Sequence, residues 1–192
     1  MNVIKTPRLI LRRFTENDLG DVYKIYGDEE INSFLPWFPP KNPEDARDFY
    51  INRIKSEYSK EGAYYCAVCL KEDNRAIGYV NISADDSHDL GYGLLKEFWH
   101  SGIITEACKA LVEQLKNDGV PFVTATHDVN NPRSGEVMRR LGMKYQYSYQ
   151  EQWQPKNVLV TFRLYQINLD GKDDRVYQKY WNNSDVHFIE VI

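Results

Sequence analysis

Long apolar runs are absent from this 192-residue sequence, and no stretch approaches the roughly 20 apolar residues that a membrane-spanning helix needs. The first residues, MNVIKTPRLILRRF, contain no run of signal-peptide length either, so we expect a cytoplasmic protein. A basic surplus is also missing, because 24 Lys and Arg residues stand against 28 Asp and Glu residues, for a net charge of −4. We therefore expect neither a membrane nor a nucleic-acid partner, whereas a cationic small substrate suits the charge.

Cysteine is scarce, with three residues in the chain. Cys66 and Cys69 spell C-x-x-C, but they lie in a β-rich segment, where positions three apart point to opposite faces. No second C-x-x-C exists to complete a metal site, and no pair with helical ligand spacing occurs among His88, His100 and His127. We expect packed cysteines and no metal.

The remaining composition is that of an ordinary globular protein. Hydrophobic residues make up 42 %, charged residues 27 % and aromatic residues 14 % of the chain, which argues against intrinsic disorder. A chain of this length suits one domain with a sizeable core.

Periodicity and capping residues predict an α/β protein with a mixed, mostly antiparallel central sheet flanked by helices. Thr15 with Asp18, and Pro43, mark two helix starts, whereas four prolines exclude a helix from residues 34–43. The expected strands are 7–13, 64–70, 76–83, 89–95, 121–128, 144–152 and 157–168, and the expected helices are 15–26, 43–54, 102–118 and 132–141. In the helix that follows Gly102, the expected inner face consists of Ile104, Ala107, Cys108, Leu111 and Leu115.

The most informative stretch is residues 90–115, where a strand passes through a short loop into that helix. Backbone N–H groups at a helix start lack internal partners and carry the positive end of the helix dipole, so they bind phosphate groups. The amides from His100 to Ile104 could hold a pyrophosphate, with Gly102 allowing close approach. An ordinary strand-to-helix turn is the alternative for this segment taken alone.

A second informative stretch is residues 130–143, NNPRSGEVMRRLGM. Asn131 can cap a helix, and Ser134 lies one turn further on. A plain capped helix is the alternative here too.

Taken in order after the opening TPRLILRR, these segments resemble the GNAT acetyltransferase superfamily, and most closely its RimJ/RimL-like branch. The family's cofactor segment corresponds here to Gly91-Tyr92-Gly93-Leu94 followed by Trp99 to Ala107. Its later N-x-x-S-x-x-V-x-x-x-L-G-F pattern corresponds to a run from Asn131 to Met143. The resemblance covers about residues 5–168, so we expect an acetyltransferase domain at 1–169 and a C-terminal extension at 170–192. The extension is either an interaction tail or an added strand.

The resemblance implies an N-acetyltransferase in which a primary amine attacks acetyl-CoA directly in a ternary complex. The strand at Gly93-Leu94-Leu95 would pair with the pantetheine amides and could donate an N–H to the thioester oxygen. The implied cofactor-binding residues are Gly93, Leu94, Leu95, His100, Ser101, Gly102, Ile103, Ile104, Thr105, Asn131 and Ser134. The acceptor would be a small-molecule amine or a protein N-terminus, and a homodimer is an open possibility.

Two residues are candidates for proton transfer. Ser134 could protonate the departing thiolate, and Glu151 could accept the proton of the amine. A first-turn serine and a solvated surface glutamate are the corresponding structural alternatives.

The sequence departs from the family pattern at three positions. His100 stands where Gly is usual, Ile104 stands where Gly or Ala is usual, and Met138 stands where many relatives have a general-acid Tyr. Ile104 is expected to crowd the diphosphate. A non-catalytic acetyl-CoA sensor and a degenerate scaffold acting through residues 170–192 are therefore the rival interpretations.

Overall fold

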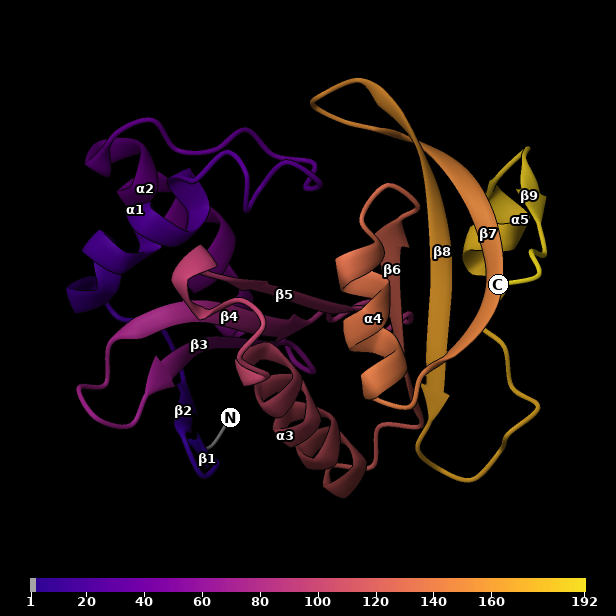
Figure 1. Cartoon of the computed structure of the whole chain (residues 1–192), viewed down its shortest axis with the longest axis horizontal. Coiled ribbons are helices and arrows are strands. Elements are labelled where there is room, and N and C mark those ends of the chain that lie inside the picture. Colours follow the sequence, from indigo (N-terminus) through magenta and orange to yellow (C-terminus); the bar gives the residue numbers. More distant parts are fainter. Residues whose placement is uncertain (1–2) are drawn as a thin grey trace.

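Two antiparallel sheets form the framework of the computed structural model, which describes residues 3–192 (Figure 1). The first sheet has the order β1-β2-β3-β4-β5, with strands Ile4–Lys5, Leu9–Arg12, Tyr64–Leu70, Ala76–Ile82 and Leu90–Leu94. The second has the order β6-β8-β7-β9, with β6 at Phe122–Asp128, β8 at Val158–Asn168, β7 at Lys144–Trp153 and β9 at His187–Phe188. A parallel bridge between Asp89 and Thr124 joins the two sheets, so the predicted mixed, mostly antiparallel architecture is confirmed.

Helices cover both faces of the first sheet. Figure 1 shows α1 and α2 on one side and α3 on the other, while α4 lies against β6. The α-helices are α1 at Leu19–Gly27, α2 at Pro43–Phe49, α3 at Ile103–Asn117, α4 at Pro132–Arg140 and α5 at Lys179–Asn183. Short 3₁₀ or π turns occupy Glu16–Asp18, Tyr50–Ile54, Lys55–Ser59 and Lys96–Phe98. Within residues 3–192, none of these helices has the length and apolarity required to cross a bilayer.

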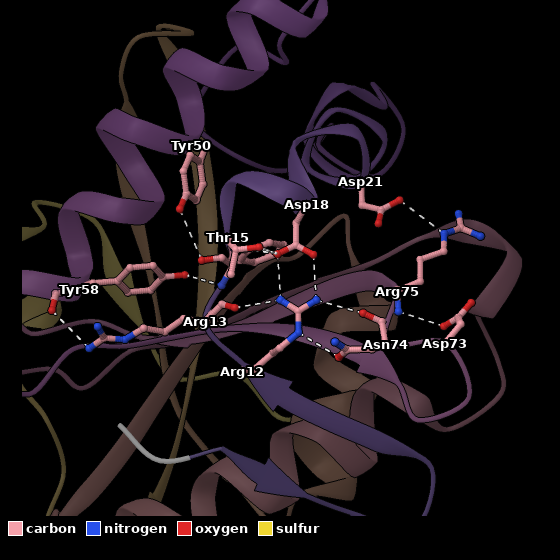
Figure 2. Close-up of polar contacts among 11 residues, drawn as sticks. Arg12, Arg13, Thr15, Asp18, Asp21, Tyr50, Tyr58, Asp73, Asn74 and Arg75 are labelled. Carbon is pink, nitrogen blue, oxygen red and sulfur yellow. Dashed lines mark hydrogen bonds and ion pairs between the residues drawn. The ribbon is translucent and has the colours of Figure 1, made fainter.

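The start of the first helical segment is fixed by a buried ion pair (Figure 2). Arg12 donates two hydrogen bonds of 2.8 Å to the carboxylate of Asp18, which also accepts hydrogen bonds from Thr15 in the predicted capping arrangement. The same guanidinium reaches Asn74 in the β3–β4 turn at 3.0 Å. One arginine therefore ties β2, the start of α1 and the β3–β4 hairpin together.

The predicted helix over 43–54 is present, but its second half differs from an α-helix. Asn42 caps it by accepting from the Asp45 N–H, with Pro43 at the first helical position. The chain then passes into a π turn and a 3₁₀ turn that end at Ser59. These turns keep Tyr50 and Ile54 buried.

The C-terminal segment adds a strand to the second sheet. In β9, His187 pairs with Tyr149 and Phe188 pairs with Ser148 of β7. A small apolar cluster forms between β7, β8 and this segment, with Tyr180 and Trp181 packed on the sheet. Of the two possibilities for residues 170–192, the structure contains the added strand.

Candidate functional site

Strands β5 and β6 lie next to each other at one end only (Figure 1). The Asp89–Thr124 bridge joins them where both strands begin, and beyond it they belong to different sheets. The other edge of β5 is paired with β4 along the whole strand. Within residues 3–192, the edge of β5 that faces β6 therefore has no ladder partner past the bridge, and its backbone groups are available to a ligand.

Hydrogen bonds distinguish the three residues predicted to serve this edge, Gly93, Leu94 and Leu95. The Leu95 N–H donates to the Ile77 carbonyl at 2.9 Å, on the β4 side. Backbone groups alternate between the two edges of an antiparallel strand, so the amide of Leu94 faces the gap and that of Gly93 faces β4. The Leu94 carbonyl accepts the indole N–H of Trp99 at 2.8 Å. The N–H of Leu94 is thus the one of the three that lies on the open edge.

Gly93 has a packing role in addition to its place on this strand. A Cβ atom at this position would lie 2.4 Å from the ring of Tyr79, which real Cβ contacts do not tolerate. That ring is fixed by stacking on Tyr26, with centroids 4.9 Å apart. Glycine is required here because an aromatic cluster packs flat against β5.

The loop before α3 has the backbone conformation that an anion site needs. Gly102 is the N-cap residue with φ 74°, and His100 has φ 60°, so both adopt the left-handed region. Ser101 and Gly102 are exposed. The N–H groups of the first helical turn, starting at Ile103, lie beyond this loop without helical partners. The sequence-based expectation for the loop geometry is therefore met.

Ile103, and not Ile104 as predicted, begins the buried face of α3. Ile103 is 6 % exposed and heads the buried stripe that continues at Ala107 and Leu111, because these positions are four residues apart. Ile104 was predicted for that stripe, but it is only partly buried and packs on the margin of the core. Its side chain therefore contacts the protein rather than standing free at the helix end.

An ionic clamp holds the loop against the N-terminal strands. The Glu106 carboxylate accepts from Thr6 Oγ1 at 2.6 Å, from the Arg8 N–H at 3.1 Å and from Arg8 Nε at 2.6 Å. Burial alone would raise the pKa of Glu106, but these donors lower it. Arg8 also donates to the Ser101 carbonyl at 3.0 Å. The two segments of the resemblance, TPRLILRR and the cofactor segment, are thus in direct contact, a role that sequence analysis missed.

A groove of about 600 Å³ opens beside this loop. Gly102 and Thr105 border it on one side, and Lys109 and Arg140 add positive charge. The remaining lining residues are Thr6, Pro7, Glu106 and Ala110. A groove with two cations next to unpartnered helix amides favours a polyanionic ligand.

The first turn of α4 comes into contact with the middle of β5. The Asn131 side chain caps α4 by accepting from the Ser134 N–H at 3.4 Å. The phenol oxygen of Tyr92 lies 2.8 Å from both the carbonyl oxygen and the Oγ atom of Ser134. Met138, one turn later, is buried with 1 % of its surface exposed. Ser134 is therefore held at the strand that carries Leu94.

A carboxyl group that sequence analysis missed lies where the two sheets join. Asp89 is partly buried, and desolvation together with the nearby charge of Glu151 raises its pKa to about 7. Its Oδ1 atom lies 2.9 Å from Thr124 Oγ1, which lies 2.9 Å from the Ser87 carbonyl. Thr124 has a single hydroxyl proton, so a protonated Asp89 can donate to Thr124 while Thr124 donates to Ser87. The acidic residue two positions before Gly91-Tyr92 was the available signal.

Glu151 lies on β7, on the same face of the second sheet as Tyr149 and Trp153. Desolvation raises its pKa, although the residue as a whole is exposed. The structure thus brings Asp89 and Glu151 into electrostatic contact and leaves Glu151 accessible to solvent. Asp89, with a pKa of about 7, is placed to exchange protons near neutral pH, and burial shifts the pKa of Glu151 in the same direction.

All three cysteines are buried. Burial raises the pKa of the Cys66 and Cys69 thiols to about 12, and it raises that of Cys108 as well. A buried thiol with a raised pKa is a poor nucleophile. The prediction that these residues serve as packing groups agrees with their burial.

Comparisons with known proteins identify the family of this chain. The family profile described as "Acetyltransferase (GNAT) domain" matches residues 8–144, more than half of the sequence, and the chain belongs to this family. An uncharacterized N-acetyltransferase of Bacillus subtilis (strain 168), YnaD, is 25 % identical over 145 residues, covering 73 % of this chain and 82 % of the relative. Acetyltransferase activity of the GNAT type follows from this membership.

Solved structures share the fold. The GNAT-family acetyltransferase from Bacillus anthracis superimposes with a TM-score of 0.75 at 21 % identity, over 88 % of this chain and 99 % of that one. The microcin C7 self-immunity acetyltransferase MccE, in complex with acetyl-CoA and AMP, gives 0.73 at 20 % identity, over 85 % and 93 %. RimL, the ribosomal L7/L12 α-N-protein acetyltransferase in complex with coenzyme A, gives 0.71 at 16 % identity, over 88 % and 99 %. RimL is one of several kinds of neighbour, so the RimJ/RimL-like branch stays a prediction.

Proposed function

We propose that this chain transfers the acetyl group of acetyl-CoA to a primary amine, which attacks the thioester directly in a ternary complex. The observation that carries the proposal is the position of the Gly102 loop, which presents helix amides next to the one edge of β5 that has an unpaired Leu94 N–H. Membership of the GNAT family supports the same reaction type. Acetyl-CoA supplies the activated acetyl group, and the chain's residues bind, orient and move protons.

The residues present fit a cofactor with a diphosphate and a long amide-bearing arm. The amides from His100 to Thr105 would hold the diphosphate, and Lys109 and Arg140 would face its negative charge. Leu94 would pair with the pantetheine arm and donate to the thioester oxygen, with Asn131 and Ser134 on the α4 side. No metal is part of the proposal.

The amine must lose a proton before it can attack, and two carboxyl groups are available for this step. Glu151 is the base expected from the sequence, and its solvent exposure leaves it open to an incoming amine. Asp89 is a second candidate, because a carboxyl with a pKa of about 7 changes protonation state at neutral pH. Separate Glu151→Gln and Asp89→Asn variants identify the base, because the variant that lacks the base loses the acidic limb of the pH–rate profile.

The acceptor is proposed only by class. RimL acts on a ribosomal protein according to its name, and MccE confers immunity to microcin C7. The proposed acceptor of this chain is therefore either a protein N-terminus or a small-molecule amine. We propose that the reaction takes place in the cytoplasm, with a homodimer as one possible assembly. Nucleic acid and membrane are not among the proposed partners.

The test combines a binding and a turnover measurement. We expect acetyl-CoA to raise the melting temperature of the protein, and coenzyme A release to occur with one member of a panel containing a peptide N-terminus, a polyamine and an aminoglycoside. Cofactor binding without release for any amine would favour the acetyl-CoA sensor. Absence of cofactor binding would favour a scaffold that acts through residues 170–192.

A further inference from the structure

The contact between Tyr92 and Ser134 connects two elements that are 42 residues apart in the sequence. Tyr92 lies in the middle of β5, and Ser134 lies in the first turn of α4. The phenol oxygen is 2.8 Å from the carbonyl oxygen of Ser134 and 2.8 Å from its Oγ atom. Both hydroxyls therefore take part in one local network next to Leu94.

The positions of the two hydroxyl protons in this network determine whether Ser134 can donate to a ligand. The phenol has one proton and can donate either to the Ser134 carbonyl or to Ser134 Oγ. In the first case the serine hydroxyl donates to Tyr92, and in the second its own proton is free to point toward a ligand. The two arrangements differ only by rotation of two O–H bonds. In the first arrangement the Ser134 proton goes to Tyr92 instead of to the serine's own helix backbone, and in the second the phenol donates to Ser134 Oγ and fixes its orientation.

Tyr92 is not a proton source for this network. Desolvation raises the pKa of its phenol far above the ordinary value. Passing its proton through Ser134 to a thiolate would leave a phenolate in a desolvated site, which is unfavourable. A serine hydroxyl without such a source can donate a hydrogen bond to a departing thiolate, but it cannot give up its proton.

We propose that Tyr92 is a positioning residue that holds the Ser134 hydroxyl at the leaving sulfur, and that Ser134 acts there as a hydrogen-bond donor rather than as a general acid. This inference rests on the proposed function. It also accounts for turnover without a phenol at Met138, the position that holds a tyrosine in the resemblance. The expectation that Ser134 protonates the thiolate is the alternative that the experiment tests.

The reaction balances without a proton from Ser134. The C–N bond forms, the C–S bond breaks, and the nitrogen loses its proton to the base. The thiolate leaves as an anion, stabilised by the Ser134 hydrogen bond, and takes a proton from water after release.

The experiment compares Tyr92→Phe, Ser134→Ala and the double variant in full-length protein, with the acceptor that gives the fastest release in the panel. We expect each single variant to lower kcat roughly 10- to 100-fold, the loss typical of a removed transition-state donor. KM for acetyl-CoA should change less than about twofold, and the double variant should be no slower than the slower single variant. Ser134→Thr, which keeps a hydroxyl, should recover most of the rate.

A change of leaving group separates positioning from packing. Acetyl-selenocoenzyme A releases a selenolate, a much weaker base than the thiolate, so it gains less from a hydrogen-bond donor. The rate loss in both single variants should shrink to within about threefold with this donor, and their pH–rate profiles should keep the parent's shape. Tyr50→Phe, which removes a buried phenol hydroxyl bonded to the Phe14 carbonyl, serves as the matched control with an unchanged rate.

Several results would overturn the proposal. An equal rate loss with the thioester and the selenoester would make Tyr92 a packing residue, as would additive losses in the double variant. Rescue of Ser134→Ala by an added acidic buffer component, at unchanged pH, would make Ser134 a general acid. If the parent acetylates no amine, the proposed function fails and this inference fails with it, whereas parent turnover with an unaffected Tyr92→Phe variant refutes only the inference.

Discussion

The two sides of the β5–β6 gap are held in place by different kinds of contact. On the α3 side, the loop at Gly102 is fixed by the Glu106 clamp, while its own amides stay exposed. On the other side, β7 and β8 are covered by stacked rings, with Tyr149 and Tyr180 5.1 Å apart at an interplanar angle of 11°. The first side offers backbone donors and cations, whereas the second offers aromatic surfaces supplied partly by the C-terminal segment.

This difference explains why the cofactor can be inferred from the sequence and the acceptor cannot. A backbone anion site needs a glycine, a helix start and a short loop, which are adjacent in the sequence and recognisable at Gly102. The second side is assembled from side chains of β7, β8 and residues 176–181, which meet only in the folded chain. Its shape is a tertiary property, and we propose that the amine binds on this side.

The largest effect is expected from breaking the α3 side. Gly102→Asp places a carboxylate at the proposed diphosphate site, in a left-handed backbone conformation that glycine adopts more readily than any residue with a side chain. We expect acetyl-CoA affinity, measured by calorimetry, to fall by about 100-fold or more through charge repulsion.

The matched control is Gly119→Asp. Gly119 also has a positive φ, of 80°, and lies past the opposite end of the same helix, where an added Cβ atom would have no neighbour within 4 Å. It carries the same strain and charge without facing the proposed site. Equal affinity losses in both variants would mean that strain or net charge, not the site, is responsible.

The next largest effect is expected at Asp89, where the two sheets join, and it depends on pH. Asp89 has a pKa of about 7 in the folded protein, against 3.8 for an ordinary aspartate, so folding takes up a proton between these values. The contribution of Asp89 to the stability of the parent must therefore fall as pH rises from about 4 through 7. Asp89→Asn keeps a donor for Thr124 and cannot ionise, so it should be more stable than the parent by about 2–4 kcal/mol at pH 8.

Urea unfolding at pH 5 and pH 8 measures this effect. The advantage of the variant should be small at pH 5 and large at pH 8. A variant that is less stable than the parent at pH 8 would show that the Asp89 carboxylate is stabilised by partners when charged.

A substitution on the β7–β8 side should lower the stability of the protein without lowering its affinity for acetyl-CoA. Trp181 packs edge-on against Tyr147, with ring centroids 5.3 Å apart, and its ring centroid lies 4.0 Å from that of His187. Because the indole is only partly buried, Trp181→Ala should cost about 2 kcal/mol in the free energy of unfolding. Acetyl-CoA affinity should stay within about twofold of the parent, and a large affinity loss would contradict the division between the two sides.

The sequence analysis predicted the order of the longer elements because each carries its own period and cap, as Thr15 with Asp18 and Asn131 with Ser134 illustrate. It missed the two-residue strand β1 and gave β9 only as one of two alternatives, because such strands are too short to have a period and exist only through pairing. It also missed the Tyr92–Ser134 contact and the raised pKa of Asp89, because both result from long-range packing. Local patterns thus predicted the glycine-bearing loop before α3, whereas the carboxyl groups proposed for proton transfer take their surroundings from tertiary contacts.

The smallest expected effect concerns Ile104, and it sharpens the description of the α3 side. The sequence suggested that this β-branched residue crowds the diphosphate, so that Ile104→Ala would tighten acetyl-CoA binding. In the structure the side chain is partly buried and packs on the core margin next to the stripe headed by Ile103. A side chain that turns toward the protein leaves the helix amides clear.

We therefore expect Ile104→Ala to change acetyl-CoA affinity by less than about twofold and to cost about 1 kcal/mol of stability through lost packing. Calorimetry and ligand-free thermal unfolding measure the two quantities separately, and a clear gain in affinity would restore crowding as the correct explanation.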